Sequence, residues 1–444
     1  MITYANPTLD LSNVDFPEVA QHMYDLMMRN IATDGFVFND PVNPQNWSLP
    51  GCVLAAPSFP KNTPNLDQDY IFNWVRDAAL TALEIIAAKP PASPGGGVQE
   101  MIDYVTFVNT CYNNAVPTKG HACFTINGYS RPWTEQNDGP ALQSVAIMLG
   151  FDLLDSATQT IGRNLIANNV NFLLGVYQDQ TTNLWEEHTG YSFFARAAQL
   201  RCFQMIKTNQ CGVAVPGGID AAISWLQNAL AGHWNGQYYV SVLTSSGAPV
   251  VPYYDPNIDI VSAALYGAVS ITDTKLLATA ARLRCQWADD SSPEQYPVNV
   301  ADRARGIGPL LGRYPGDTYD GDQGNTTLGK HPWALCTCNL AELYYALANQ
   351  IDKSHSIPFD TLSAPFFAQV GVNSATVSSA TASAALRSAG DAMLRAVLFH
   401  SDHLELSEQF DGVSGFEKSV RNLTWSYGAF LSAVRAKTGQ AVRG

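Results

Sequence analysis

Apolar residues recur along most of the chain at spacings of three and four, which is the pattern of helices that bury one face. About twelve segments show this pattern, at residues 17–31, 74–88, 98–114, 140–154, 158–175, 191–207, 218–231, 257–269, 273–288, 333–350, 379–399 and 422–437. Strand-type patterns are few, and the clearest, at residues 236–251, predicts a small hairpin. Long helices, even in number and joined by aromatic-rich loops, predict an all-α fold that forms a helical toroid or a large α-array.

Length and composition indicate one large core. The chain has 444 residues, of which 46% are hydrophobic and 14% charged. Length alone favours about three domains. However, no linker rich in proline, serine or threonine divides the chain, and the Pro/Gly cluster at 89–97 is typical of a loop between helices. We therefore expect a single domain over residues 1–444.

The charge and the lack of long apolar runs argue against two classes of partner. The formal net charge is −14 and the basic residues are scattered, so a phosphate backbone would be repelled and nucleic acid is not an expected partner. No run of about twenty apolar residues exists in the sequence, so we expect no membrane span. The first residues show no signal peptide. Either a leader was removed before this numbering, or the protein stays inside the cell.

The cysteines and a phosphate-loop look-alike do not indicate a cofactor. Eight cysteines without CxxC pairs favour structural thiols or a few disulfides over a metal site. Cys202 and Cys211 are close enough in sequence to bridge a short loop. The stretch GNTTLGKH at 324–331 imitates a phosphate-binding loop, but His331 stands where a hydroxyl residue would ligate magnesium. We expect neither a metal ion nor a cofactor.

Several loops carry tryptophan, arginine and acidic residues together at helix starts. One stretch, NLWEEH, places Trp185, Glu186 and Glu187 just before the helix expected at 191–207. The other groups are Tyr70, Trp74, Arg76 and Asp77; Arg131, Trp133 and Asp138; Arg313, Asp317 and Tyr319; Trp333; and Glu405, Glu408 and Asp411. A single Arg–Asp pair, or a glutamate at a helix start, is usually structural. Together these loops fit a sugar site, because flat aromatic faces pack on a sugar ring and charged groups bind its hydroxyls.

The acids in these loops are also suited to cleaving a glycosidic bond. The leaving oxygen needs a proton donor, and a second carboxylate must activate water or attack the sugar. The acid pair Glu186 and Glu187, together with the distant Glu408, can supply these two groups. Because the sequence does not contain their separation, it leaves inversion and retention both open.

Seven stretches, taken in order, make the chain resemble the glucoamylases of glycoside hydrolase family 15, the fungal type in particular. They are DYIFNWVRDAAL, QNDGPAL, NLWEEHTGYSFF, GRYPGDTY, HPWALCT, SEQFDG and RNLTWSYGAFL, between residues 69 and 431. The resemblance implies an (α/α)6 barrel whose loops form one funnel-shaped pocket. It also implies an exo-acting, inverting enzyme that releases β-D-glucose from the non-reducing ends of α-1,4 glucans and, more slowly, from α-1,6 linkages.

The resemblance assigns roles to residues that match the family's motifs. Glu186 matches the general acid and Glu408 the general base, and Ser419 matches a serine that supports the base. Substrate-binding positions are implied for Tyr70, Trp74, Arg76, Asp77, Tyr129, Arg131, Trp185, Glu187, Arg313, Asp317 and Trp333.

Three positions depart from the family pattern. Tyr129 stands where the family has an active-site tryptophan two residues before an arginine, here Arg131, and Trp133 is a candidate substitute. Asn183 replaces a usual aspartate, and Phe410 replaces a usual tyrosine beside the base. These last two changes remove or soften polar groups around the reacting bond, so rate, pH optimum and preferred linkage are expected to be affected.

Two alternative interpretations stay open. One is a related family 15 hydrolase that acts on isomaltose, glucodextran or trehalose, and the other is a sugar-binding module without catalysis. The presence of both Glu186 and Glu408 disfavours the second. We expect an α-glucan or malto-oligosaccharide as substrate, a secreted monomer, and no starch-binding domain. In a secreted chain Asn46, Asn325 and Asn422 are glycosylation acceptors.

Overall fold

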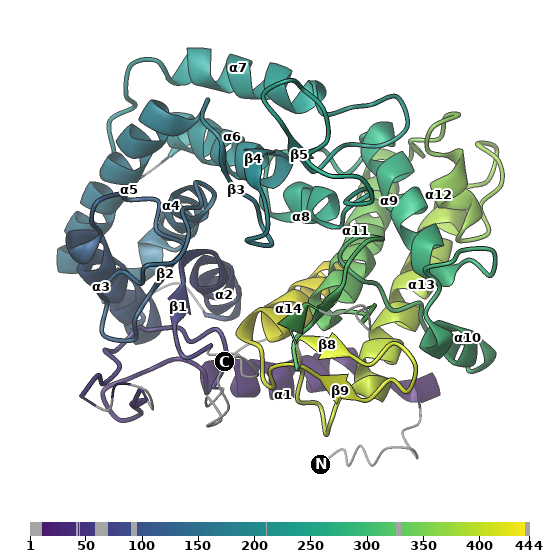
Figure 1. Ribbon diagram of the computed structural model, residues 1–444, viewed down its shortest axis with the longest axis horizontal. Helices are drawn as coiled ribbons and strands as arrows, with labels where there is room; N and C mark the ends of the chain where they lie inside the picture. Colours follow the sequence, from purple (N-terminus) through teal and green to yellow (C-terminus); the bar gives the residue numbers. More distant parts are fainter. Residues whose placement is uncertain are drawn as a thin grey trace.

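Six helices form a closed inner ring around the centre of the protein (Figure 1). The structure is a computed structural model and describes residues 11–40, 43, 45–57, 70–89, 96–209, 211–322, 324–325 and 330–439. The inner helices are α2(Val75–Ala88), α4(Gly139–Leu149), α6(Phe193–Thr208), α8(Asp259–Tyr266), α11(Ala334–Ser354) and α14(Thr424–Thr438). Each contacts the next in this order, and α14 contacts α2, which closes the ring.

A second layer of six helices surrounds this ring. Its members are α1(Phe16–Met28), α3(Gln99–Asn114), α5(Ser156–Val176), α7(Ile219–Ala231), α9(Thr274–Ala288) and α13(Ser379–His400). Along the chain, outer and inner helices alternate, and each outer helix contacts at least one inner helix. This double ring is the expected (α/α)6 barrel.

Burial explains which helices form the inner ring. In α2 every residue from Val75 to Ala82 is buried, as expected for a helix with protein on all sides. By contrast, α5 and α7 bury residues on one face and expose the others. Sequence periodicity detects both kinds of helix, but it does not say which layer a helix joins.

The twelve helices predicted from periodicity are all present, with ends shifted by a few residues. Two short helices were missed, α10(Pro297–Ala304) and α12(Ala364–Ala368), because so few residues do not establish a period. The helix expected at 140–154 ends at Leu149, and a 3-10 turn, η2(Phe151–Leu153), follows Gly150. Gly150 is closely packed where the helix stops, since a Cβ there would lie 2.8 Å from the methyl carbon of Met101 and 2.9 Å from the side chain of Ile86. The first described element is another 3-10 turn, η1(Leu11–Asn13).

The strands of the described residues are short and antiparallel, and they form three two-stranded sheets and one three-stranded sheet in the loops between helices. They are β1(Asn73–Trp74) with β2(Cys123–Phe124), β3(Thr181–Thr182) with β4(Thr189–Ser192) and β5(Val242–Leu243), β6(Tyr319–Asp320) with β7(Gly324–Asn325), and β8(Gln409–Phe410) with β9(Glu417–Lys418). The small hairpin predicted at 236–251 is present over residues 242–250. Leu243 bridges antiparallel to Pro249, the N–H of Thr244 donates to Ala248 O at 2.8 Å, and the N–H of Val250 donates to Val242 O at 3.0 Å. Its strand β5 also pairs with β4.

The structure decides between the alternatives left open for the cysteines. All eight are free thiols, Cys202 and Cys211 included, and seven of them are buried. The phosphate-loop look-alike at 324–331 falls largely outside the described residues. Among the described helices, none combines the length and the apolar character needed to cross a membrane.

Candidate active site

The loops that precede the inner helices meet at one end of the barrel and enclose a cavity of about 540 Å³. The N-terminal ends of α2, α11 and α14 contribute Trp74, Trp333 and Trp425 to its wall. The positive ends of these helix dipoles therefore face the cavity and favour anionic groups there. The site residues predicted from the sequence line this cavity, except Tyr129, Asp317 and Ser419.

Glu186 lies in a tight turn that Asn183 shapes. The side-chain oxygen of Asn183 accepts hydrogen bonds from the backbone N–H groups of Glu187 and His188, both at 3.0 Å. Its backbone carbonyl accepts one from the N–H of Glu186, also at 3.0 Å. Glu186 adopts a left-handed backbone with φ of +63°, which is uncommon for a glutamate. The turn thus holds the acid in a conformation that the local sequence alone would not favour.

The carboxyl group of Glu186 is held between two indoles. Trp74 Nε1 donates to Oε1 at 2.7 Å, and Trp133 Nε1 donates to Oε2 at 2.6 Å. Arg76 Nη2 lies 4.0 Å from Oε1, and the Glu186 side chain is 18% exposed. Each oxygen therefore has a fixed donor, and the group faces the cavity.

Glu408 is the second carboxylate of the cavity and is more deeply buried. Its side chain is 4% exposed and accepts hydrogen bonds from Tyr70 at 2.8 Å, from Tyr319 at 3.2 Å and from Ser419. Burial raises the pKa of Glu408 above its ordinary value, and the three donors oppose this by favouring the ionised form. The backbone N–H of Glu408 also donates to Val420 O at 2.9 Å, which keeps Ser419 beside the carboxylate.

Arg313 joins two acids on one wall of the cavity. Its guanidinium donates to both oxygens of Asp317 at 2.7 and 2.6 Å and to Glu187 Oε1 at 2.9 Å. Burial alone would lower the pKa of Arg313, but the charges of Asp317 and Glu187 raise it well above its ordinary value. Tyr254 and Tyr314 donate their hydroxyls to Glu187, at 2.9 and 2.8 Å. Asp317 therefore orients Arg313 from behind instead of lining the cavity.

Arg76 and Asp77 stand at the start of α2. Arg76 Nη1 donates to Asp138 Oδ2 at 3.0 Å and to Gln136 Oε1 at 3.1 Å. Burial raises the pKa of Asp77 to about 7, although the charge of Arg76 acts in the opposite direction. Arg76 Nε and Asp138 Oδ1 are buried without a protein partner. Arg76 and Asp77 line the cavity, whereas Asp138 and Gln136 hold the guanidinium of Arg76 from outside the lining.

Comparison with known proteins decides the family. A model of the Glycosyl hydrolases family 15 matches residues 21–435 of this chain. The chain belongs to this family. The match confirms the family predicted from the seven sequence stretches, and with it the glycosidase class.

Several glucoamylases are similar in sequence to most of this family 15 chain. Glucoamylase GLU1 of Saccharomycopsis fibuligera is 26% identical over 93% of the chain and 87% of the relative. The Saccharomyces cerevisiae protein named "Glucoamylase, intracellular sporulation-specific" is 25% identical over 87% of the chain and 79% of the relative. A solved Saccharomycopsis fibuligera glucoamylase structure superposes with a TM-score of 0.79 at 22% identity, over 99% of the chain and 98% of that structure. This last likeness confirms the fold.

Tyr129 and Trp133, two aromatic residues of one loop, lie in different places relative to the cavity of the family 15 enzyme. Tyr129 is 60% exposed and lies outside the cavity lining. Trp133 reaches Glu186 instead, and its ring lies 4.4 Å from the guanidinium carbon of Arg131. Arg131 lies in turn 3.9 Å from the ring of Phe72. The structure thus supports Trp133 as the substitute suggested by the departure at Tyr129.

Sequence reasoning missed several residues of the family 15 site. Trp425 stacks on Trp185 at 6.2 Å between ring centroids and lies 5.4 Å from the guanidinium of Arg76. Asn257 accepts a hydrogen bond from Trp185 Nε1 at 2.9 Å, and so leaves the indole face free for the cavity. The stretch RNLTWSYGAFL contained Trp425, and its tryptophan at a helix start was a usable signal. No comparable signal marked Asn257.

Two other acids singled out in the sequence have local structural contacts. Asp411 accepts hydrogen bonds from the backbone N–H groups of Val413 and Ser414 in the β8–β9 turn, and Glu405 accepts one from the side-chain amide of Asn422. Neither lines the cavity. Within the described ranges, no group of three or more histidine, cysteine, aspartate or glutamate side chains is arranged to hold a metal ion.

Proposed function

We propose that this family 15 hydrolase is an exo-acting, inverting glucoamylase. It releases β-D-glucose from the non-reducing ends of α-1,4-linked glucans and malto-oligosaccharides and acts more slowly on α-1,6 linkages. The observation that carries the proposal is the presence of Glu186 and Glu408 in one cavity, each with its own fixed hydrogen-bond donors. Glycoside hydrolysis requires two such carboxyl groups on either side of the bond to be cleaved.

Glu186 is suited to donate the proton to the leaving oxygen. Its carboxyl group faces the cavity, and the indoles of Trp74 and Trp133 fix its orientation. A proton donor must lie within hydrogen-bond reach of the departing oxygen. Because each oxygen has its own donor, the carboxyl group keeps one orientation towards the bound substrate.

Glu408 is suited to act as the general base. A base has to be ionised to accept a proton from water, and hydrogen bonds from Tyr70, Tyr319 and Ser419 favour the ionised form in spite of burial. Inversion requires room for a water molecule between Glu408 and the anomeric carbon. We therefore predict a separation of about 6.5–9.5 Å between the two carboxyl groups, compared with about 5–5.5 Å in a retaining enzyme.

The charged groups at the inner end of the cavity support action on chain ends. Arg76, Asp77 and Arg313 are each buried and line the wall. Charge-assisted hydrogen bonds from such groups hold the hydroxyls of a terminal glucose unit. The faces of Trp185 and Trp333 pack against the C–H groups of the ring. Fixed charged groups and indole faces that bind one terminal unit favour release of single glucose units over internal cleavage.

A panel of four substrates tests the proposal. The enzyme is incubated with maltose, isomaltose, maltoheptaose and trehalose, and NMR identifies the released sugar and its anomer before mutarotation. We expect β-glucose from maltose and maltoheptaose, with maltohexaose as the first other product of maltoheptaose. Release of α-glucose first, or a trapped glucosyl–Glu408 adduct, would contradict the role of Glu408. Preferred cleavage of isomaltose or trehalose would favour the alternative family 15 specificity.

We further propose that the enzyme is a secreted monomer with one catalytic domain. Both carboxylates and the surrounding side chains come from a single chain, so the site is complete without a second copy. Asn46 lies partly exposed in a loop, where a glycan can be attached. One similar yeast glucoamylase is named intracellular. Secretion is tested directly: a glycan on Asn46 and protein in the culture medium would support it, and protein retained in the cell would contradict it. Light scattering would establish whether the mass in solution is that of a monomer.

A further inference from the structure

Tyr253, in the loop before α8, is exposed to solvent and adopts an unfavourable backbone conformation. Its side chain is 80% exposed and its φ is +66°. The left-handed region is unfavourable for residues with a Cβ. An exposed ring adds almost no buried apolar area, so the fold gains little from a tyrosine here. Strained residues of this kind often mark binding sites.

The backbone of Tyr253 is held firmly against the motif that contains Arg313. The N–H of Gly316 donates to the carbonyl of Tyr253 at 2.9 Å. A Cβ at Gly316 would lie 2.9 Å from that same carbonyl oxygen and 3.1 Å from the Cβ of Tyr253. Glycine is therefore required at position 316 for this close approach. The contact ties Tyr253 to a segment whose Arg313 lines the cavity.

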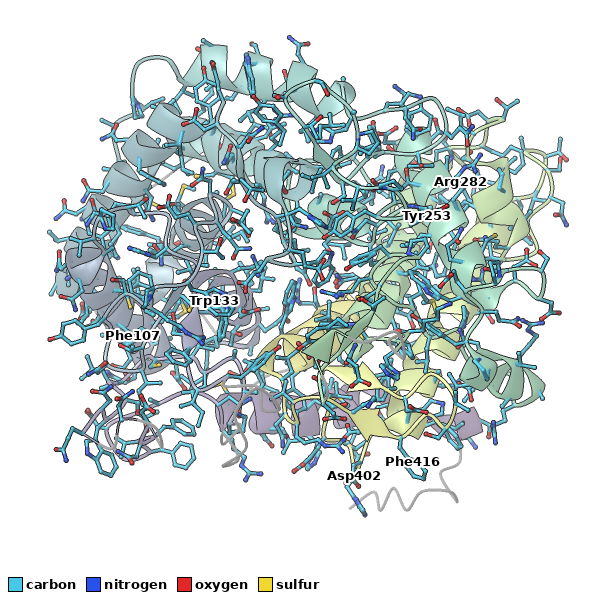
Figure 2. The ribbon with its side chains drawn as sticks, in the orientation of Figure 1. Phe107, Trp133, Tyr253, Arg282, Asp402 and Phe416 are labelled. Carbon is cyan, nitrogen blue, oxygen red and sulfur yellow. The ribbon has the colours of Figure 1, made fainter. Side chains whose placement is uncertain are left out.

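The next residue, Tyr254, points in the opposite sense. It is 2% exposed, its hydroxyl lies 2.9 Å from Glu187 Oε2, and its ring centroid lies 4.2 Å from that of Tyr314. Because Glu187 lines the cavity, Tyr254 is anchored behind the wall while Tyr253 stays outside it. Tyr253 is therefore on the outer side, or rim, of the wall that Tyr254 supports, and Figure 2 shows it across the centre of the ring from Trp133.

We propose that Tyr253 is a stacking platform for the glucose units beyond the two that flank the cleaved bond, and that it sets a preference for longer chains. The inference rests on the proposed glucoamylase function. A chain whose end is bound at Arg76 and Asp77 must leave the cavity past Glu186, and its remaining units then extend over the rim. A flat, rigidly mounted phenol ring is suited to pack against the C–H face of one of them.

The experiment compares wild type, Tyr253→Ala and Tyr253→Phe on maltose, maltotriose, maltotetraose and maltoheptaose. We expect Tyr253→Ala to lower kcat/KM on maltoheptaose about threefold to tenfold, the range of one aromatic stacking contact, mainly through KM. Its kcat/KM on maltose should stay close to that of wild type, because maltose does not extend to the rim. Tyr253→Phe should behave like wild type, since the ring face makes the contact. The shortest substrate that shows the loss identifies the unit that is bound.

Two further variants separate this role from general damage to the fold. Phe416→Ala removes an aromatic ring that is 76% exposed on the β8–β9 turn. It should not change the ratio of kcat/KM on maltoheptaose to kcat/KM on maltose. Tyr253→Gly removes the backbone strain, so it should keep or raise Tm while losing the long-chain preference as Tyr253→Ala does.

The outcomes separate this inference from the proposed function. If wild type releases glucose from both maltose and maltoheptaose, the proposed function stands. The platform alone is then overturned in either of two cases. One is a Tyr253→Ala variant whose ratio of kcat/KM on maltoheptaose to kcat/KM on maltose equals that of wild type. The other is a Tyr253→Phe variant that loses as much kcat/KM on maltoheptaose as Tyr253→Ala does. If wild type releases no glucose from any malto-oligosaccharide, the proposed function fails and the platform fails with it.

Discussion

The indole N–H of Trp133 lies 2.6 Å from Oε2 of Glu186, although Trp133 is 54% exposed. The backbone on either side of Trp133 is tied to the strand region before α4, through Arg131 N to Cys123 O at 3.2 Å and Ala122 N to Thr134 O at 3.0 Å. An exposed side chain is thus held in place by its main chain. This explains how it can orient the carboxyl group of Glu186.

Trp133→Phe should reduce kcat on maltose by about threefold to tenfold, since it removes a hydrogen bond of about 0.5–1.5 kcal/mol that orients the carboxyl group of Glu186. The aromatic ring stays, so KM should change little. Tyr129→Phe is the matched control, because Tyr129 lies outside the cavity lining, and its kcat should stay within about twofold of wild type. An equal loss in both variants would contradict the assignment of Trp133.

Glu186→Gln should lower kcat by about 10²–10⁴-fold, the usual contribution of a general acid. The amide occupies the same volume but cannot deliver a proton. Binding of maltoheptaose, measured by calorimetry, should be largely retained because Arg76, Asp77 and Arg313 are unchanged. A variant that turns over within about tenfold of wild type would show that another group donates the proton.

Tyr70→Phe should move the acidic limb of the kcat/KM profile to higher pH. The hydroxyl of Tyr70 donates to Glu408 at 2.8 Å and favours the ionised carboxylate. Without it the pKa of Glu408 rises further, and a base is active only above its pKa. We expect a shift of about 0.4–1 pH unit, which corresponds to a hydrogen bond of about 0.5–1.5 kcal/mol. Tyr319→Phe, which removes a longer bond of 3.2 Å, should shift the limb in the same direction by less. A shift to lower pH would contradict the base role.

The folded protein should be more stable at pH 5 than at pH 8. Burial raises the pKa of Asp259 to about 8, and that of Asp255 to about 7. In the unfolded chain both are ionised above about pH 4. The stability they contribute is therefore present at low pH and is lost as pH rises through their folded pKa values. Urea unfolding at several pH values measures this loss.

Asp259→Asn should lose less free energy of unfolding between pH 5 and pH 8 than wild type does. The difference should be at least about 1.4 kcal/mol, the equivalent of one pKa unit. Asn stays neutral, so raising the pH no longer places a charge at this fully buried position. Asp179→Asn, at an exposed site, is the control and should leave the pH dependence unchanged. If Asp259→Asn loses as much free energy of unfolding between pH 5 and 8 as wild type does, Asp259 is not a neutral buried acid.

Helices and motifs could be predicted because both are local properties of the chain. A spacing of three and four places apolar side chains on one face of any helix, so the helices predicted at 191–207 and 379–399 could be located without a structure. Glu186 and Glu408 could be proposed as the catalytic pair because each lies within a short recognisable stretch, and both line the cavity. Short elements such as α10, with only Pro297–Ala304, carry too few residues for a period and were missed.

Contacts between distant loops depended on the tertiary structure. Tyr129 and Trp133 are both aromatic residues of one loop, and only the folded backbone directs Trp133, and not Tyr129, to Glu186. Asp317 lies in a motif with Arg313, yet it orients the guanidinium from behind. The physical reason is that side-chain direction depends on backbone torsion angles, which neighbouring helices and hydrogen bonds set. Local residue patterns therefore identified the chemical groups of this enzyme, while the packing of the two helix rings determined which of those groups meet.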